Sequence, residues 1–423
     1  MSKTTAIIII VVALLIITGG VVAWYFSVSQ NGDNSGTATS TETGISRFFP
    51  FGGGNNTQPT NTDTEGGNTN TNNNADNESG GEAPTLREIS SAPTASFAPA
   101  FDPIDGPLVR YIEQETGNVY EAPLKVVTKT RISNQTIPRV REAVWFPGGS
   151  GFIARYQSDS DSIESFSAVI KRATSTDEEG TLSGRFLQKD ITSIAVITPK
   201  SATTSRNTVR IAYTTKDTDT HIYLANFDGT KSTKFADIKL NEVNLLPITE
   251  SNVLIQTKPS GVSGGALFAV NSRTGQLDRV LGNYLGFSSI VSEDGNIVVF
   301  SALSGNLPML FVHDRKTGER TSLNLRSLAD KCSFSIKNKE KIFCAVPNSI
   351  ASGLVYPDAW LQGKVSFTDS VWEIDTKTLS KTKVVDSEKL NFFIDVDLIS
   401  PSEDDQFVIL RDKATRSLWS VKI

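Results

Sequence analysis

Histidine and cysteine are scarce in this chain of 423 residues, which contains two of each. A Ser-His-Asp triad needs a histidine beside a nucleophile, and most zinc sites need several histidines or cysteines. The two histidines, His221 and His313, stand in the expected third strands of different repeats, where we expect solvated or hydrogen-bonded side chains. We therefore predict no metal, no cofactor and no histidine-based catalysis.

An excess of basic residues is also missing, because the formal net charge is -5 at pH 7. Most of the imbalance falls between residues 27 and 84, and beyond residue 84 the acidic and basic side chains cancel. A neutral folded part gives no electrostatic footprint for nucleic acid or anionic lipid. We therefore expect no nucleic-acid partner.

Uncharged apolar sequence occurs as one long run, AIIIIVVALLIITGGVVAWYF, from Ala6 to Phe26. It is long enough to cross a bilayer as a helix. A cleaved signal peptide is the alternative, but it would show a shorter apolar region and a small-residue cleavage site rather than the aromatic trio 24–26. Lys3 precedes the run and the next positive charge is Arg47, which favours a cytoplasmic N-terminus. We predict a transmembrane anchor over residues 1–26, with the rest of the chain extracytoplasmic.

Residues 27–84 lack any periodic apolar face and consist mainly of Asn, Thr, Gly and Ser. This composition is typical of a disordered linker, whose r.m.s. reach would be about 40 Å. Inside it lies an aromatic segment, ISRFFPFGGG, from Ile45 to Gly54. This segment either has no role or is a short docking motif for a partner in the cell envelope.

A repeated unit begins beyond residue 84, and its clearest copy starts at Gly286. There GFSSIVSEDGNIVVFSA predicts two strands joined at Asp294-Gly295, and PMLFVHDRKTGERTSLNL predicts two more joined at Thr317-Gly318. Glycine supplies the positive φ that tight turns require. Each unit is thus an expected four-stranded antiparallel meander, and copies recur about 40 to 55 residues apart, the spacing of propeller blades.

The expected first strands number seven, and the last copy lacks its fourth strand. They begin near Ala95, Arg141, Ile191, Asn241, Gly286, Lys331 and Phe392. At the other end of the repeat region, TLREIS, Thr85–Ser90, looks like an outer strand without a blade of its own. Laid beside Leu418–Ile423, it would close the ring and leave no exposed sheet edge. We predict an all-β domain over residues 85–423: a seven-bladed β-propeller closed by an N-terminal strand.

The hairpins IVSEDGNIVVF, AVWFPGGSGFIARY and LISPSEDDQFVIL resemble degenerate copies of the Ser-Pro-Asp-Gly hairpin of TolB-type, WD-like propeller repeats. The resemblance extends from about Thr85 to Ile423. It implies the fold and little about function, because such propellers serve as binding platforms and as non-catalytic partners of peptidase domains. No second domain follows Ile423, so we do not expect the peptidase arrangement.

The two cysteines, Cys332 and Cys344, are equidistant from Asn338 at the expected turn of the sixth unit. Directly opposed residues on neighbouring antiparallel strands lie within reach of a disulfide. An exported, oxidising location favours the bond, and the alternative is two buried thiols that pack as small apolar groups. We predict a disulfide between them.

Two local patterns suggest chemistry but lack the required context. GVSGG, Gly261–Gly265, matches the G-x-S-x-G elbow of hydrolases, yet here the serine falls in a loop between two strands rather than before a helix. Acidic clusters at 158–162, 216–220 and 402–405 have no full set of Ca²⁺ ligands and are interpreted as solvated loops. We therefore assign no catalytic residue.

The longest expected connection, Pro347–Ser370, joins the second and third strands of the sixth unit and contains Tyr356, Trp360 and Phe367. In a propeller these connections share one face with the links between blades, whereas the tight turns occupy the other face and leave little room for recognition. Long loops in compact domains are commonly functional. The three aromatic residues are our candidate binding surface. The alternative is an insertion that plugs the channel or covers a blade edge, with the aromatic side chains buried.

Two functions remain. The first is a surface-tethered, non-catalytic module that binds a protein or glycan, in a cell-envelope assembly. The second is a membrane-anchored hydrolase or lyase that uses carboxylates, or tyrosine with arginine, at the mouth of the channel. Arg-Tyr pairs occur at Arg110-Tyr111 and Arg155-Tyr156.

Overall fold

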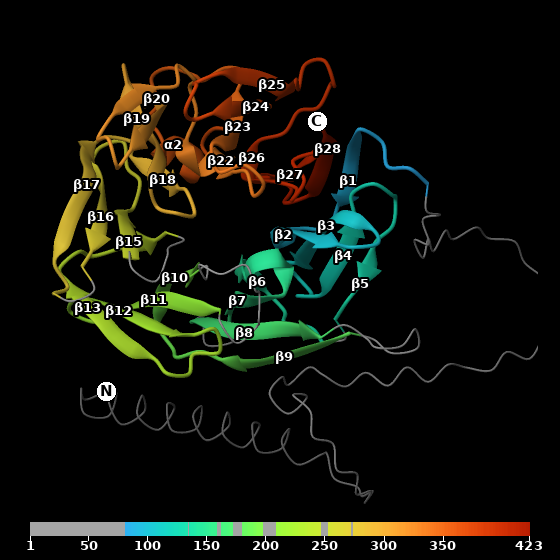
Figure 1. The fold of residues 1–423 in the computed structure, drawn as a ribbon, viewed down its shortest axis with the longest axis horizontal. Coiled ribbons are helices and arrows are strands. Elements are labelled where there is room, and N and C mark those ends of the chain that lie inside the picture. The colour runs from blue at the N-terminus through green and yellow to red at the C-terminus, as the bar shows by residue number, and fades with distance from the viewer. Residues whose placement is uncertain are drawn as a thin grey trace, which may run out of the picture. The chain divides into compact units, whose positions relative to one another are not determined.

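The computed structural model describes residues 81–133, 135–158, 162–171, 180–197, 209–246, 253–271 and 274–423. Within these ranges the strands form seven four-stranded antiparallel sheets arranged in a ring (Figure 1). The predicted all-β, seven-bladed propeller is confirmed. The predicted anchor and all but the last four residues of the predicted linker lie outside the described residues, within which no helix is long and apolar enough to cross a membrane.

Each blade is a meander whose first strand lies next to the central channel. Blade 1 contains β2 (Thr94–Asp102), β3 (Gly106–Glu113), β4 (Val119–Pro123) and β5 (Thr130–Arg131). Blade 2 contains β6 (Val140–Trp145), β7 (Gly151–Gln157), β8 (Ile163–Lys171) and β9 (Thr181–Phe186). Blade 3 contains β10 (Ile191–Ile197), β11 (Arg210–Lys216), β12 (Thr220–Asn226) and β13 (Thr233–Ile238).

Blade 4 contains β14 (Val243–Leu245), β15 (Val253–Thr257), β16 (Gly265–Val270) and β17 (Leu277–Tyr284). Blade 5 contains β18 (Ser288–Val291), β19 (Ile297–Ser304), β20 (Leu307–Asp314) and β21 (Arg320–Ser322). Blade 6 contains β22 (Cys332–Phe334), β23 (Lys341–Pro347), β24 (Asp369–Asp375) and β25 (Lys381–Val385). Blade 7 contains β26 (Val396–Pro401), β27 (Phe407–Asp412), β28 (Leu418–Lys422) and β1 (Leu86–Ser90). Short helices are η2 (Pro147–Gly149), η4 (Ala329–Lys331) and α2 (Asp358–Leu361).

The core lies between neighbouring blades rather than within one of them. A single apolar cluster runs from Ile222 in blade 3 through Leu254 and Leu267 in blade 4 to Phe300 in blade 5. Because each blade is covered on both faces, its inner strands are nearly continuous apolar runs. Strand β11, for example, is buried at five consecutive positions.

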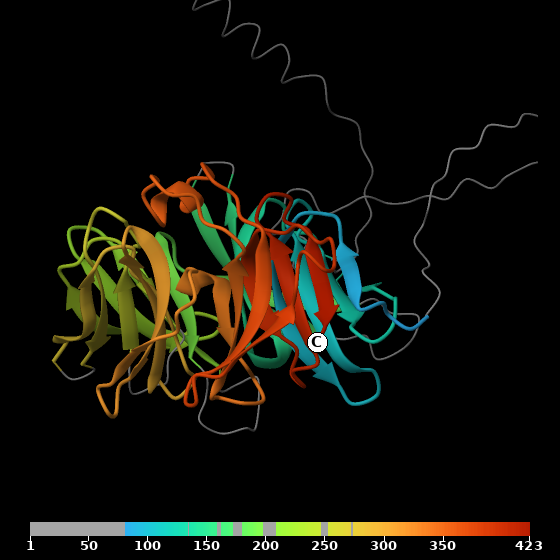
Figure 2. The ribbon, with the colours of Figure 1, turned by 90° about the horizontal axis from the view of Figure 1, so that it is seen from above.

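The ends of the strands form two faces, which the edge-on view of Figure 2 separates. One carries the two tight turns of each blade and is called the turn face below. The other, called the loop face, carries the connections between second and third strands and the links between blades. This division follows from the meander, because successive antiparallel strands reverse direction.

Side chains build the first turns of blades 5 and 7 in the same way. The Ser292 hydroxyl donates to Asp294 at 2.6 Å, and the Ser402 hydroxyl donates to Asp404 at 2.7 Å. In both turns the same hydroxyl also accepts the backbone N–H that begins the second strand. Short polar side chains thus replace the hydrogen bonds that a tight turn cannot make with its own backbone.

The predicted closure of the ring is confirmed. Strand β1 pairs antiparallel with β28, with Leu86 opposite Val421 and Ser90 opposite Leu418. The first strand and the last three therefore share blade 7, and the blade has the same strand count as the other six.

Two arginines strengthen the seam between blades 7 and 1. Arg87 of β1 is buried and donates to three backbone carbonyls, one at the end of β4 and two in the segment that follows it, at distances of 2.7 to 3.1 Å. Arg411 of β27 is held by Asp397 at 2.8 and 2.9 Å and donates to the carbonyls of Thr94 and Ala95 in β2. These cations satisfy carbonyls at the boundary between two sheets, where no strand partner exists.

Replacing Arg87 with alanine should lower the free energy of unfolding by about 2–3 kcal/mol, because three partly buried carbonyls lose their charged donor. Urea denaturation of Arg87→Ala measures this change. Glu88→Ala, an exposed neighbour on the same strand, is the control and should change stability by less than about 0.5 kcal/mol. Equal stability of the two variants would show that the seam does not depend on Arg87.

Candidate binding cavity in the central channel

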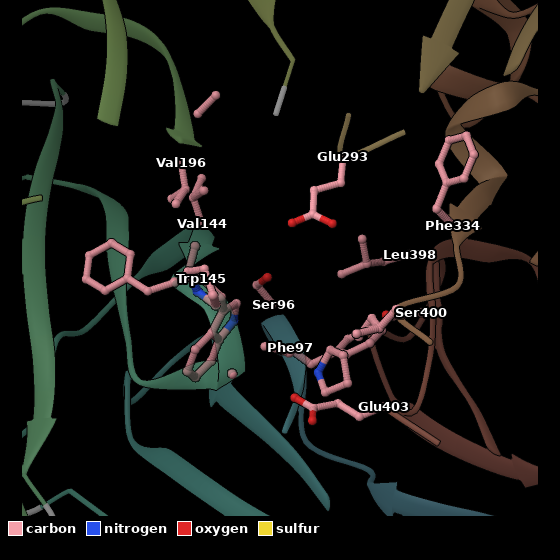
Figure 3. A pocket seen from close by; sticks show the side chains of 18 of the residues that line it. Ser96, Phe97, Val144, Trp145, Val196, Glu293, Phe334, Leu398, Ser400 and Glu403 are labelled. Carbon is pink, nitrogen blue, oxygen red and sulfur yellow. The ribbon is translucent and has the colours of Figure 1, made fainter. Parts of the chain in front are cut away.

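A cavity of about 650 Å³ lies in the channel at the turn face (Figure 3). Its walls come from β2, β6, β10, β14, β22 and β26, and its rim includes Ser292, Ser335 and Glu403 in the first turns of blades 5, 6 and 7. Every blade therefore contributes at least one lining residue. The sequence did not predict this cavity, because its lining residues come from seven separate segments. The tight turns also suggested little room for recognition on this face.

The walls are mostly apolar. Consecutive residues of the inner strands line the cavity, among them residues 194–196 of β10 and 398–400 of β26. The other apolar wall residues include Phe97, Trp145, Leu245, Phe334 and Ile336. Cavities of this size and character are typical of sites that bury much of a small ligand or a few side chains.

Charged groups are few in this lining. Glu293 and Lys339 form an ion pair with 2.9 Å between the carboxylate and Nζ, and both side chains are at least half exposed. Glu403 makes no ion pair within the described part of the chain, and its carboxylate lies at the other side of the cavity in Figure 3. Burial, together with the neighbouring Asp404 carboxylate, raises the pKa of Glu403. The 402–405 cluster is thus not simply the solvated loop that we expected.

The candidate binding residues on the insertion point inward. Tyr356, Trp360 and Phe367 are 0%, 3% and 7% exposed and pack on Leu328. The burial agrees with the alternative that the insertion covers blade edges. That its surface binds a partner remains a prediction.

The insertion lies across the loop face of blades 4 to 7. The Gly261 N–H, in the β15–β16 loop, donates to Asp358 at 2.6 Å, and Lys413, in the β27–β28 loop, donates to the Trp360 carbonyl. Leu303 and Leu307 of blade 5 pack against the same aromatic cluster. The two ends of the channel therefore differ: the insertion lies on the loop face, whereas the cavity lies at the turn face.

A buried ion cluster holds the insertion to blades 6 and 7. The Lys331 side chain is fully buried, with its Nζ atom 2.8 Å from Asp369 and 2.7 Å from Asp395. The indole N–H of Trp360 donates to Asp395 at 2.9 Å, and the Lys331 Nζ lies 4.6 Å from the Trp360 ring centroid and 5.1 Å from that of Phe367. The aromatic side chains thus shield a charge cluster from water.

The two carboxylates share Lys331 unequally. Burial raises the pKa of Asp369 to about 6, because it outweighs the attraction of Lys331. Burial also opposes ionisation of Asp395, but Lys331, Trp360 and further hydrogen bonds hold its pKa below the usual value. Asp395 therefore keeps its charge to a lower pH than Asp369 does.

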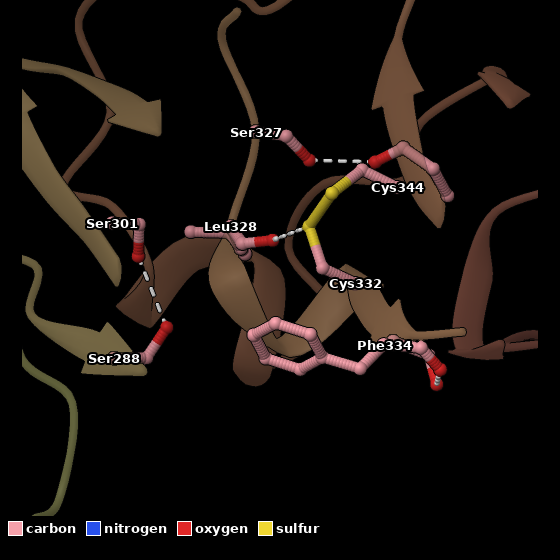
Figure 4. The surroundings of a disulfide bond; sticks show 9 residues. Ser288, Ser301, Ser327, Leu328, Cys332, Phe334 and Cys344 are labelled. Atoms are coloured by element: carbon pink, nitrogen blue, oxygen red, sulfur yellow. Dashed lines mark hydrogen bonds between the residues drawn. A yellow bond between two sulfur atoms is a disulfide. The ribbon is translucent and has the colours of Figure 1, made fainter. Parts of the chain in front are cut away.

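The predicted disulfide is confirmed. Cys332 and Cys344 are directly opposed on β22 and β23 and bonded to each other, with Cα atoms 4.1 Å apart (Figure 4). Both residues are buried between blades 5 and 6. The bond fixes the inner hairpin that carries Phe334 and Ser335 into the cavity wall.

The other sequence candidates lie outside the cavity. Ser263 is in the loop between β15 and β16, so the context of a nucleophile elbow is absent there. His221 hydrogen-bonds to Asp237 and, at 3.0 Å, to Asp217, and these bonds raise its pKa. His313 is buried beside the Glu319 carbonyl at 3.0 Å, and burial lowers its pKa. The hydrogen-bonded roles expected for both histidines are confirmed.

The two Arg-Tyr pairs lie within blades 1 and 2, on the second strands β3 and β7. Arg110 pairs with Glu121 at 2.8 Å and Tyr111 is fully buried, while the Tyr156 hydroxyl donates to Glu164 at 3.0 Å. None of these residues lines the cavity.

Comparison with known proteins supports the architecture. No family model and no curated protein matches the chain. Among solved structures, oligogalacturonate lyase from Vibrio parahaemolyticus is similar at a TM-score of 0.51 and 8% identity, covering 80% of this chain and 93% of the lyase. At this identity the likeness shows the propeller fold alone. The propeller fold that the resemblance to TolB-type repeats implies is confirmed.

Two further similar structures have TM-scores below 0.5. The tricorn protease matches at a TM-score of 0.48 and 10% identity over 81% of this chain, which spans 34% of the protease. TolB from Acinetobacter baumannii matches at 0.40 and 10% identity over 77% of this chain, which spans 63% of that protein. The chain therefore covers about a third of one relative and less than two thirds of the other.

Removing the disulfide with Cys332→Ala/Cys344→Ala should lower the free energy of unfolding by about 3 kcal/mol, because the bond closes a loop with a sequence separation of 12. Urea denaturation of the variant and of oxidised wild-type protein measures the loss. Reduced wild-type protein should show a similar loss. If all three samples unfold at the same urea concentration, the bond does not constrain the unfolded chain.

The stability of the protein should depend on pH through Asp369. Its folded pKa of about 6 exceeds the usual value of 3.8, so the folded state binds more protons than the unfolded state between these values. The resulting stabilisation is complete below pH 4 and is lost as the pH rises through 6. Asp369→Asn should abolish this component in denaturation curves recorded from pH 4 to 8. Glu373→Gln, on the same strand, should retain it, and an unchanged slope in Asp369→Asn would contradict the assignment.

Proposed function

We propose that the chain is a non-catalytic module that binds a protein partner through the channel cavity. The observation that carries this proposal is the cavity of about 650 Å³ with mostly apolar walls and three charged lining residues. From the sequence alone, this propeller would be tethered to a membrane by residues 6–26, outside the cytoplasm, in a cell-envelope assembly.

The apolar walls favour a protein over a glycan. A sugar presents hydroxyl groups on most of its surface, and these lose hydrogen bonds to water against aliphatic walls such as Ile194, Val196 and Leu398. Aliphatic and aromatic side chains of a protein gain by the same burial. The volume suits a few side chains, so the partner would insert an anchor segment rather than dock a whole domain.

A membrane-anchored hydrolase or lyase is the alternative. Arg110-Tyr111 and Arg155-Tyr156, suggested by the sequence for this chemistry, lie outside the cavity lining. The alternative therefore rests on the carboxylates Glu293 and Glu403, one of which is already paired with Lys339. No contact of these carboxylates favours it over binding.

Filling the cavity should abolish binding without unfolding the protein. Full-length protein and its Leu398→Arg variant are used to capture proteins from an envelope extract. A specific partner should be captured by wild type and lost, by at least about tenfold, with Leu398→Arg, which places a charge on the apolar wall. Phe101→Arg is the control, because Phe101 is half exposed on the turn face outside the cavity lining.

Melting temperatures of both variants, recorded in parallel, should stay close to that of wild type. Capture of the same proteins by Leu398→Arg and by wild type would overturn the cavity as the binding site. Release of shortened saccharides or peptides from the extract by wild type, and not by Leu398→Arg, would favour the hydrolase or lyase.

A further inference from the structure

The cavity lining contains one charged side chain without an opposite charge beside it, and this property restricts the chemistry of a ligand that would bind there. Its charged lining residues are Glu293, Lys339 and Glu403, of which the first two form an ion pair. Glu403 has neither an ion pair nor a side-chain hydrogen bond within the described part of the chain. The ligand chemistry inferred from this free carboxylate rests on the proposed binding function.

The hydrogen bonds of the turn that carries Glu403 explain why its carboxylate, unlike the two that follow it, has no partner within the described residues. Three acidic residues follow one another, Glu403, Asp404 and Asp405. Asp404 accepts the Ser402 hydroxyl at 2.7 Å and the Gln406 N–H at 3.2 Å, so it completes the turn. Asp405 accepts the hydroxyl of Ser335 in blade 6 at 2.6 and 2.8 Å. Two of the three carboxylates therefore stabilise the fold, and the third lines the cavity.

The Glu403 carboxylate is partly withdrawn from water and has no opposite charge beside it within the described part of the chain. A carboxylate withdrawn from water loses solvation, which an opposite charge or hydrogen-bond donors must offset. The raised pKa of Glu403 has this cause, with the neighbouring Asp404 adding repulsion. A cationic group of a ligand would remove both penalties.

We propose that the cavity takes a peptide segment in which an arginine or lysine stands beside aliphatic or aromatic side chains. Glu403 pairs with the cation, and the apolar side chains fill the space between Ile194 and Leu398. An arginine suits the site best, because its planar fork binds a carboxylate through two hydrogen bonds. The Lys339 ammonium, already paired with Glu293, disfavours a cation on that side of the cavity.

The test uses a display library of random heptapeptides selected on immobilised full-length protein. We expect enrichment of peptides that contain arginine or lysine next to leucine, isoleucine, phenylalanine or tryptophan. One enriched peptide is then synthesised with its arginine, and again with neutral citrulline in that place. Fluorescence polarisation should show about tenfold weaker binding of the citrulline peptide.

Glu403→Gln should reduce the affinity for the arginine peptide by about tenfold and leave the affinity for the citrulline peptide nearly unchanged. Glu88→Gln is the matched control, since it removes the same charge from an exposed site on the outer strand of blade 7 and should change neither affinity. Acidification should weaken binding of the arginine peptide to wild type as Glu403 becomes protonated, but should not weaken its binding to Glu403→Gln.

The outcomes separate this inference from the proposed function. The selected peptides could bind wild type and not Leu398→Arg, yet show no preference for a cation or bind Glu403→Gln equally well. That result would overturn the assignment of a cationic ligand and leave the proposed function, binding through the cavity, in place. If no selected peptide depends on Leu398, the cavity is not a peptide site and both proposals fail.

Discussion

Closure of the ring is the constraint on which the rest of the structure depends. Each blade has two apolar faces, and the inner strands are buried on both sides, so an open array would expose one complete blade face at each end. Pairing of β1 with β28 makes the last blade from both ends of the domain. Arg87 and Arg411 then bind carbonyls across the boundary between blades 7 and 1. Only in the closed ring do the seven first strands surround one axis and form one cavity.

The two faces of the ring are stabilised differently. On the turn face, short polar side chains complete the tight turns, as Ser292 and Asp294 do in blade 5. On the loop face, the insertion is held by the buried Lys331 between two carboxylates, an arrangement whose desolvation cost is offset by close pairing and by the indole N–H of Trp360. Replacing such a cluster by apolar residues often preserves stability, so its contribution is better understood as fixing where the insertion lies.

Local signals made much of the fold predictable from the sequence. Alternating strands, Asp-Gly and Thr-Gly turns and the spacing of two cysteines about Asn338 depend on neighbours within a hairpin, and the structure confirms all of them. The second turn of blade 6 lacks glycine but follows the same path as that of blade 5. Leu379 has a φ of 61° in blade 6, where Gly318 has a φ of 77° in blade 5. A non-glycine residue can adopt this conformation at a cost of about 1 kcal/mol, so the loss of glycine weakened the sequence signal without changing the turn.

The candidate cavity could not be predicted in the same way. Ile194 of blade 3 and Leu398 of blade 7 are far apart in the sequence, and no local pattern in β10 or β26 indicates that their residues line a cavity. Glu403 lies in an acidic run that has the composition of a solvated turn, and its role depends on Ser335 of another blade engaging Asp405 instead. The insertion is the opposite case: its aromatic residues give a strong local signal, and the structure places Trp360 and Phe367 over Lys331.

The position of the cavity follows from the geometry of the ring. Seven first strands around one axis leave a space that their own side chains do not fill, and apolar side chains such as Phe97, Ile194 and Leu398 line it. A ligand that buries these side chains gains roughly 25 cal/mol for each Å² of apolar surface removed from water, but this gain hardly distinguishes one apolar group from another. Discrimination must come from the charged group that has no partner in the lining, the Glu403 carboxylate. A ligand without a cation leaves the desolvation penalty of this carboxylate in place, so the same group that costs stability in the protein gives the cavity its selectivity.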